Sequence, residues 1–216
     1  VPVGGTVAPG VSATLLGLSG TRGRRANVGW VNASSTAITV DLELFDAAGR
    51  LLAQRSYEQP PFGQRQINDV FASLAVESVD AAYARVSANG RFQPYASVVA
   101  AVSNDPIYVP ALTGTSTSTA LLIPAAAKVT GAQNTDWRTD LWLLNLGFST
   151  TQATVSFWRH GQSNPTPDSA VISAGPGEMV AVGDAMTELF GADGVQGALA
   201  IQADQLVVAS SRTYNT

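Results

Sequence analysis

The sequence predicts an all-β protein made of two antiparallel β-sandwich domains in tandem, each with one short helix. Two observations predict this fold class. Two diverged copies of one segment of about 100 residues fill the chain, and this is a common domain size. Within each copy, short runs of β-branched and aromatic residues alternate with Gly, Pro and Asn, as is typical of sandwiches.

An internal repeat is the basis of the two-domain prediction. Residues 25–32 align with residues 138–145 at an offset of 113. From residues 36–40 against 151–155 the offset becomes 115, and it holds as far as residue 86. Prolines and aspartates stay in phase over this stretch, which is hard to obtain by chance.

The same alignment places the end of the repeat and the boundary between the copies. Near the end the offset settles at 111, which pairs Asn104 with Asn215 and makes one hairpin loop longer in the first copy. The polar, small-residue stretch 112–120 is expected to join the copies. We therefore place the domains at residues 1–114 and 115–216.

Residues 37–45 show the strand pattern most clearly. Apolar side chains alternate with polar ones, which predicts a strand buried on one face. The segment 46–49 then supplies the turn of a hairpin. A short helix is expected where Asp184 can cap residues 184–190 and a glycine follows, and residues 69–74 are its counterpart in the first copy. Antiparallel sandwiches with these features are immunoglobulin-like.

Composition excludes several classes of function. Charged residues make up only 13% of the chain and the net charge is −4, which argues against nucleic acid as a partner. The absence of cysteine removes disulfides, thiolate nucleophiles and cysteine metal sites. The apolar runs are too short to insert in a membrane. The expected partner is a protein or a polysaccharide.

Copy two resembles a known module. The motifs WRTDLWLLN at 137–145 and SRTYN at 211–215, with the Asp184 helix between them, are similar to a tandem-repeated β-sandwich module of secreted and surface proteins of bacteria. Copy one departs from the pattern, with Asn27 in place of the aspartate. The resemblance implies a secreted or cell-surface bacterial location and a function that is generally undefined, and it implies no catalytic residues.

Residues suited to catalysis are few. His160 is the single histidine and falls in an expected turn, without a nucleophile elbow beside it. Asp41 and Glu43 share one face of a strand, so a carboxylate-based hydrolase is the weakest of three functional alternatives. We expect no cofactor. Calcium stays open as a ligand of loop aspartates, although the spacing of a dedicated site is absent; the candidates are Asp184, Asp193 and Asp204.

The best candidate for a binding surface is aromatic. If Leu141 and Leu143 face the core, Trp142 faces outward with Asp140, and the same alternation places Trp158 outward on what we expect to be the next strand. Two exposed indoles would make a platform for sugar rings or the centre of a protein contact. Packing of this face against the other copy or the N-terminal segment is the third interpretation.

Three charged residues are expected to be structural. Arg138, Asp140 and Arg212 are predicted to form a salt-bridge network that joins the first strand of copy two to its last. Together these observations predict a non-catalytic extracellular structural, adhesion or protein-binding module of a larger exported bacterial protein. The alternative is a carbohydrate-binding accessory module that uses Trp142 and Trp158.

Overall fold

A computed structural model describes residues 5–21, 23–101, 104–132 and 135–215. The chain is all-β, with antiparallel strands and two short helices in the described residues, which confirms the predicted class. It divides into two compact units, Val1–Ser116 and Thr117–Thr216. Within the described ranges, no helix is long and apolar enough to cross a membrane.

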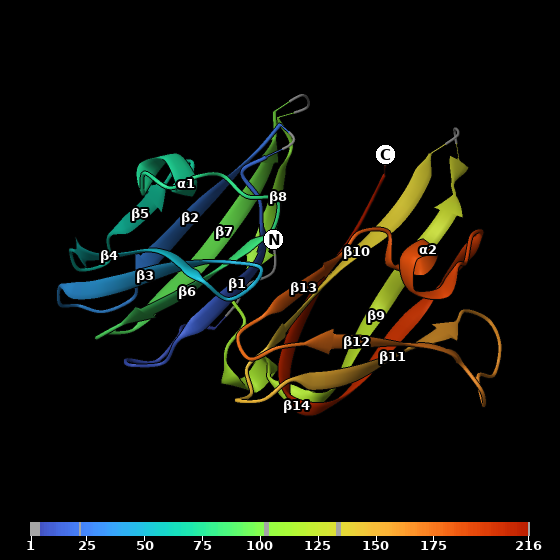
Figure 1. The fold of residues 1–216 in the computed structure, drawn as a ribbon. Coiled ribbons are helices and arrows are strands. Elements are labelled where there is room, and N and C mark those ends of the chain that lie inside the picture. The colour runs from blue at the N-terminus through green and yellow to red at the C-terminus, as the bar shows by residue number, and fades with distance from the viewer. Residues whose placement is uncertain (1–4, 22, 102–103, 133–134, 216) are drawn as a thin grey trace. The chain divides into compact units, whose positions relative to one another are not determined.

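Unit 1 carries two sheets that share one hydrophobic core (Figure 1). One sheet has the order β1-β6-β3-β4 and the other β5-β2-β7-β8. The elements are β1 (Ala13–Leu18), β2 (Arg24–Asn32), β3 (Ile38–Asp46), β4 (Leu51–Gln59), β5 (Gln64–Ile67), α1 (Val70–Ser73), β6 (Ala82–Ala88), β7 (Phe92–Ala100) and β8 (Pro106–Pro110). Trp30, Phe71 and Phe92 are fully buried in this core.

Unit 2 is built on one curled sheet with the order β12-β11-β14-β9-β10-β13. After a 3-10 turn at Gly114–Ser116, its elements are β9 (Ser118–Thr130), β10 (Asp136–Asn145), β11 (Thr151–Arg159), β12 (Asp168–Ala174), β13 (Met179–Val182), α2 (Ala185–Phe190) and β14 (Val195–Asn215). The long strand β14 pairs with β11 and β9 along its first half, and with β10 along its second half. Strand β14 therefore occupies, as one continuous strand, the positions that β6 and β7 occupy in unit 1.

The expected strand and helix positions are confirmed in both units, but the Asp184 side chain makes no capping hydrogen bond, whereas that of Asp69 accepts from the Ala72 N–H. In β3 the side chains of Ile38, Val40, Leu42 and Leu44 are buried and the residues between them are partly exposed. The two helices start after Asp69 and Asp184, and α2 ends at Gly191 in the left-handed conformation, with φ 59°. Burial of one face thus organises these segments as periodicity predicts.

Strand pairing shows the repeat in three dimensions. In each unit the first strand carries one extra residue opposite the same point of its partner, which is a β-bulge. The pairs on either side of the bulge are Leu15↔Ala84 and Leu18↔Ala82 in unit 1, and Ile123↔Leu199 and Ala126↔Gly197 in unit 2. Strand β9 therefore corresponds to β1 at an offset of 108.

The pairing also corrects the sequence alignment of the third strands. Leu42 pairs with Val86, whereas Val155 pairs with Ile201, so β11 corresponds to β3 at an offset of 113 and not 115. The change of offset lies instead in the hairpin between β11 and β12, which is longer than its counterpart in unit 1. The alignment error arose because a few Thr and Val residues are identical under the wrong offset. Extra residues in a hairpin loop leave no trace in the sequences of the flanking strands, so the alignment placed the change of offset too early.

The end of the repeat needs a second correction. Asn32 pairs with Phe92 and Asn145 pairs with Val207, so the offset stays at 115 along β7 and does not fall to 111. The connections before these residues have equal length, and Ala100 rather than Asn104 corresponds to Asn215. The expected longer hairpin in copy one is therefore wrong.

A buried asparagine fixes the same loop in each unit. Asn32 and Asn145 are fully buried, and both amide groups bind the backbone of the connection to the next strand. The Asn145 amide donates to the carbonyls of Ser149 and Ala174, at 2.8 and 3.0 Å, and its oxygen accepts from the Gly147 N–H at 2.8 Å. These bonds satisfy backbone groups that would otherwise be buried without partners.

Candidate functional site

The two predicted platform tryptophans do not lie on neighbouring strands. Trp142 is on β10 and Trp158 is on β11, and β14 pairs with both of these strands. Trp142 lies opposite Ser210 and Trp158 lies opposite Ala198, twelve residues away along β14. The indoles therefore occupy different parts of the curled sheet, and the structure does not bring them together as one platform.

Trp142 is half-buried and already has a stacking partner. The Arg212 guanidinium lies 5.7 Å from its ring centroid. In unit 1 the corresponding cross-strand pair is Gly29 opposite Tyr95, so the aromatic residue is on the other strand of the pair. Each unit thus places one aromatic ring and one small residue at this point, which indicates a role in packing for Trp142.

Asp140 and Arg212 form a nearly buried ion pair across β10 and β14. Their closest atoms are 2.6 Å apart, and the side chains are 10% and 11% exposed. The Tyr214 hydroxyl donates to Asp140 at 3.2 Å, and its ring lies 4.3 Å from the Arg212 guanidinium. Burial, with the Asp140 charge second, raises the pKa of Tyr214. Both side chains of this pair are therefore largely shielded from water.

Arg138 belongs to a different group of charges. It binds Asp136 at 2.7 Å and lies 3.8 Å from Asp184, while Lys128 binds the other oxygen of Asp136, also at 2.7 Å. Hydrogen bonds from Lys128 and then from Arg138 lower the pKa of Asp136 to about 2. The predicted network of Arg138, Asp140 and Arg212 is thus corrected to two groups, because Arg138 reaches along its own strand to Asp136.

Asp140 also accepts a hydrogen bond from the backbone, and unit 1 contains the equivalent contact. Its Oδ1 accepts the backbone N–H of Asp184, the residue before α2, at 3.1 Å. In unit 1, Asn27 accepts the backbone N–H of Asp69, before α1, at 3.0 Å. Both aspartates have left-handed backbones, with φ of 47° and 48°. Asp140 is therefore part of the frame that holds the helix, and the binding role predicted for it has no support in this geometry.

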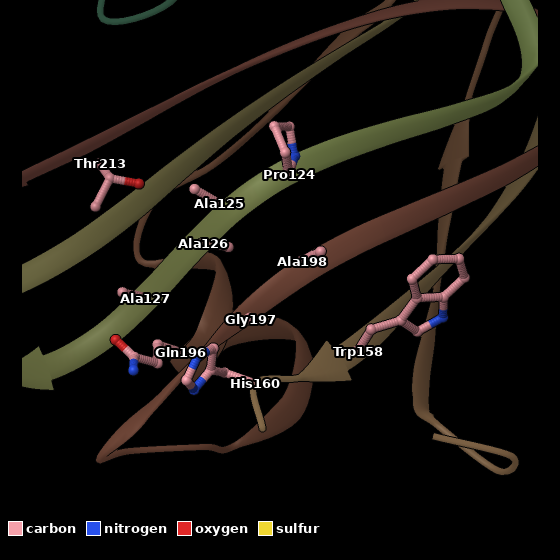
Figure 2. Close-up of a pocket in the computed structure, with 10 residues that line it drawn as sticks. All are labelled: Pro124, Ala125, Ala126, Ala127, Trp158, His160, Gln196, Gly197, Ala198 and Thr213. Carbon is pink, nitrogen blue, oxygen red and sulfur yellow. The ribbon is translucent and has the colours of Figure 1, made fainter. Parts of the chain in front are cut away.

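Trp158 differs from Trp142, because its indole is 43% exposed and borders an open hollow of about 450 Å³ (Figure 2). Pockets for small ligands are commonly roughly 300–1,000 Å³. The hollow lies over β9, β11 and β14, and its lining consists of Pro124, Ala125, Ala126, Ala127, Trp158, His160, Gln196, Gly197, Ala198 and Thr213. Figure 2 shows His160 and Gln196 side by side at one end, away from the indole.

Comparison with unit 1 explains the hollow. Opposite Phe45, which corresponds to Trp158, unit 1 has Tyr83, and the two rings stack with centroids 4.9 Å apart and planes at 8°. Opposite Trp158, unit 2 has Ala198. The indole thus keeps its place while the second ring of the stack is replaced by a methyl group. The sequence alignment missed this relationship, because it set Trp158 against Glu43.

The lining of the hollow suits a ring with hydroxyl groups. An exposed indole face binds the apolar face of a ring, and much of the remaining lining from β9 and β14 is alanine. His160 and Gln196 supply donors and acceptors at the rim. None of the lining residues carries a carboxylate, so this hollow offers a place to bind and lacks a pair of acids for hydrolysis.

The sequence matches no protein-family model and no curated protein. Among solved structures, the Anabaena sensory rhodopsin transducer is similar over 42% of this chain and 97% of its own, with a TM-score of 0.34 and 8% sequence identity.

The remaining sequence candidates lie apart from the hollow. Asp41 accepts a hydrogen bond from Ser56 at 2.5 Å, across the exposed face of β3 and β4. Asp204 accepts from the Thr151 hydroxyl at 2.6 Å and from the Gln152 N–H at 3.0 Å, and these bonds lower its pKa. Within the part of the chain that the structure describes, no three acidic or histidine side chains gather as metal ligands.

Proposed function

We propose that this chain is a non-catalytic extracellular structural, adhesion or protein-binding module of a larger exported bacterial protein, and that its two units are diverged immunoglobulin-like sandwiches. The use of the charged residues supports this proposal. Asp140 and Arg212 pair with one another, and Lys128, Asp136 and Arg138 form a second group. These charges hold strands and a helix in place.

A carbohydrate-binding role is the second candidate, and one observation favours it. Unit 2 has Ala198 where unit 1 has Tyr83, so an exposed Trp158 lies opposite a methyl group and not opposite a second aromatic ring. A pyranose ring stacked on this indole would take the place of the missing tyrosine, and His160 and Gln196 offer polar groups at the other end of the hollow. The predicted platform of two tryptophans is thereby reduced to one tryptophan and a polar rim.

The experiment that tests sugar binding uses variants that empty or fill the hollow. Soluble gluco-, manno- and chito-oligosaccharides are titrated against the chain and followed by tryptophan fluorescence and calorimetry. Trp158→Ala removes the stacking face, and Ala198→Tyr restores the ring that unit 1 has. We expect both variants to lose binding, by tenfold or more where stacking is worth about 1.5 kcal/mol.

Trp142→Ala is the matched control, because Trp142 stacks on Arg212 and lies outside the hollow. Sugar binding that survives Ala198→Tyr but disappears in Trp142→Ala would refute the assignment to Trp158. No binding of any of the three sugar classes would leave the structural or protein-binding role as the proposal. Release of shorter sugars during the titration would instead support a hydrolase.

A further inference from the structure

The sheet face of unit 2 that lies opposite its core carries a wide patch of uncharged side chains across β12, β11, β14 and β9. Thr154 on β11 pairs with Val171 on β12 and with Gln202 on β14, so these side chains form one row across the sheet. The rows on either side of it are built in the same way. We call this patch the neutral face, and it consists of Ala120, Leu122, Gln152, Thr154, Ser156, Trp158, Ser169, Val171, Ser173, Ala198, Ala200 and Gln202.

Unit 1 has charges on the corresponding face. Its residues Asp41, Glu43 and Arg85 correspond by strand register to Thr154, Ser156 and Ala200 of unit 2. The same strands therefore form with or without these charges, so the fold does not require a neutral face. Depletion of acidic residues and lysine distinguishes the centre of a protein interface from the rest of a protein surface. The composition of the neutral face is thus that of an interface.

The polar side chains of the neutral face bind one another across strands. The hydroxyls of Ser156 and Ser169 lie 2.9 Å apart and share a hydrogen bond, and the Gln152 amide donates to the Ser173 hydroxyl at 2.9 Å. Asp204, at one end of the face, accepts from the Gln152 N–H at 3.0 Å. Groups that already have a protein partner lose less when water is removed from them. A flat partner can therefore cover this face at a low cost in desolvation.

The neutral face is complementary to itself. A two-fold axis parallel to the strands, between β11 and β14, sets β11 of each copy over β14 of the other, and β12 over β9. Trp158 of one copy then lies over Ala198 of the other, where unit 1 has the ring of Tyr83. At the edges, each larger apolar side chain also meets a small one, Val171 opposite Ala120 and Leu122 opposite Ser169.

We propose that two copies of this chain associate through the neutral face of unit 2, about this two-fold axis. Sheets that pack face to face lie about 10 Å apart with their strands about 30° from parallel. An uncharged face meets its own copy without repulsion between like charges, which favours a second copy as the partner of a chain with net charge −4. This inference rests on the protein-binding part of the proposed function and names the partner.

The size of the face sets the strength of the association. Four strands span about 19 Å, and the stretch of β11 from Gln152 to Trp158 is about 24 Å long, so each copy contributes roughly 450 Å². The total of about 900 Å² is below the roughly 1,200–2,000 Å² of stable interfaces. The exposed apolar side chains that it would cover are Leu122, Trp158 and Val171, which are 56%, 43% and 61% exposed. The expected product is a weak dimer that forms at high concentration.

The first experiment measures the mass of the full chain by sedimentation, from about 1 μM to about 1 mM. We expect a shift from monomer to dimer across this range. Thr154→Asp and Ser156→Glu restore the charges that unit 1 carries, and each should weaken association by about tenfold or more, because the charge is buried without a partner. Thr187→Glu, at an exposed position of α2, is the matched control and should associate normally. Equal urea midpoints at low concentration show that all variants fold.

The second experiment tests the axis by charge complementation. Ser156→Glu and Ala200→Arg are made in separate chains, each of which should associate weakly alone. The axis sets position 156 of one copy opposite position 200 of the other, so an equal mixture should associate at least about tenfold more tightly than either variant. A mixture no tighter than its components would overturn the arrangement, and a wild-type chain that stays monomeric up to about 1 mM would overturn the dimer itself.

The sugar titration separates this inference from the carbohydrate role, since both use Trp158. A chain that stays monomeric and binds oligosaccharides through Trp158 would overturn the dimer and assign the neutral face to a polysaccharide. A chain that dimerises and binds none of the sugars would support the dimer and refute only the carbohydrate role. If both occur, bound sugar should shift the dimer towards monomer, because one indole cannot serve both partners.

Discussion

The backbone N–H of Asp184 donates a hydrogen bond to Oδ1 of Asp140, at 3.1 Å, and thereby ties the start of α2 to β10. Asn27 and Asp69 make the same contact in unit 1, at 3.0 Å. An aspartate and an asparagine can both accept this bond, but only the aspartate can also neutralise an arginine. In unit 2, the Asp140 carboxylate accordingly forms an ion pair with Arg212.

Substitutions at Asp140 should separate these two tasks. Asp140→Ala removes the acceptor of the helix and leaves Arg212 nearly buried without its partner, so we expect a loss of about 3 kcal/mol in the stability of unit 2. Asp140→Asn keeps the acceptor, as unit 1 does, and should cost less. Urea unfolding followed by helix and tryptophan signals measures both. An equal loss in the two variants would contradict a separate role for the bond to Asp184.

Asn145 should be sensitive to the loss of its amide hydrogens. Because its amide donates to two backbone carbonyls, Asn145→Asp puts a carboxylate against acceptors and should cost more than Asn145→Ala, which we expect to cost about 2 to 3 kcal/mol. Denaturant unfolding gives both values. Gln202→Ala, at an exposed position of β14, is the control. Greater stability of the aspartate variant than of the alanine variant would refute the hydrogen-bond assignment.

The aromatic residue of the Trp142 and Ser210 pair, like that of the Gly29 and Tyr95 pair, should be exchangeable between the two strands. Trp142→Gly alone and Ser210→Tyr alone should each destabilise unit 2, by a cavity and by crowding respectively. The double variant reproduces the Gly29 and Tyr95 pair of unit 1 and should be more stable than the sum predicts, by about 1 kcal/mol. A double-mutant cycle of unfolding free energies measures this coupling. Strict additivity would show that the two positions do not share one space.

Asp136 should make the stability of unit 2 depend on pH in acid. Its pKa is about 2 in the folded protein against an ordinary 3.8, so the folded state holds the ionised form more tightly. Its contribution is therefore complete above about pH 4 and is lost as the pH falls through about 2. In Asp136→Asn, the urea concentration at the unfolding midpoint should therefore fall less steeply between about pH 4 and about pH 2. Asp193→Asn, at an exposed loop position, should not change this slope.

Local structure was predictable from the sequence to a large extent. The alternation of Ile38 to Leu44 and the aspartate before each helix are properties of single segments, and both are confirmed. Periodicity of this kind does not report which strands are neighbours. The predicted platform of Trp142 and Trp158 is therefore wrong, because it assumed that β10 and β11 are neighbouring strands.

The hollow at Trp158 required knowledge of register across strands. Ala198 and Tyr83 are unremarkable in sequence, and only their partners, Trp158 and Phe45, show that one ring of a stack is absent. The alignment also shifted by two residues in β11, so it compared Trp158 with Glu43. The length of one hairpin loop was enough to hide the relationship.

The two hydrophobic cores draw on separate stretches of chain, one from Val7 to Val109 and the other from Ile123 to Val207. A pulling force applied to the ends should therefore lengthen the molecule in two discrete events. Each event would release about 100 residues, or roughly 300 Å of extended chain. A protein that joins two larger bodies could in this way yield to a sudden load by opening one unit, and regain its original length when that unit refolds.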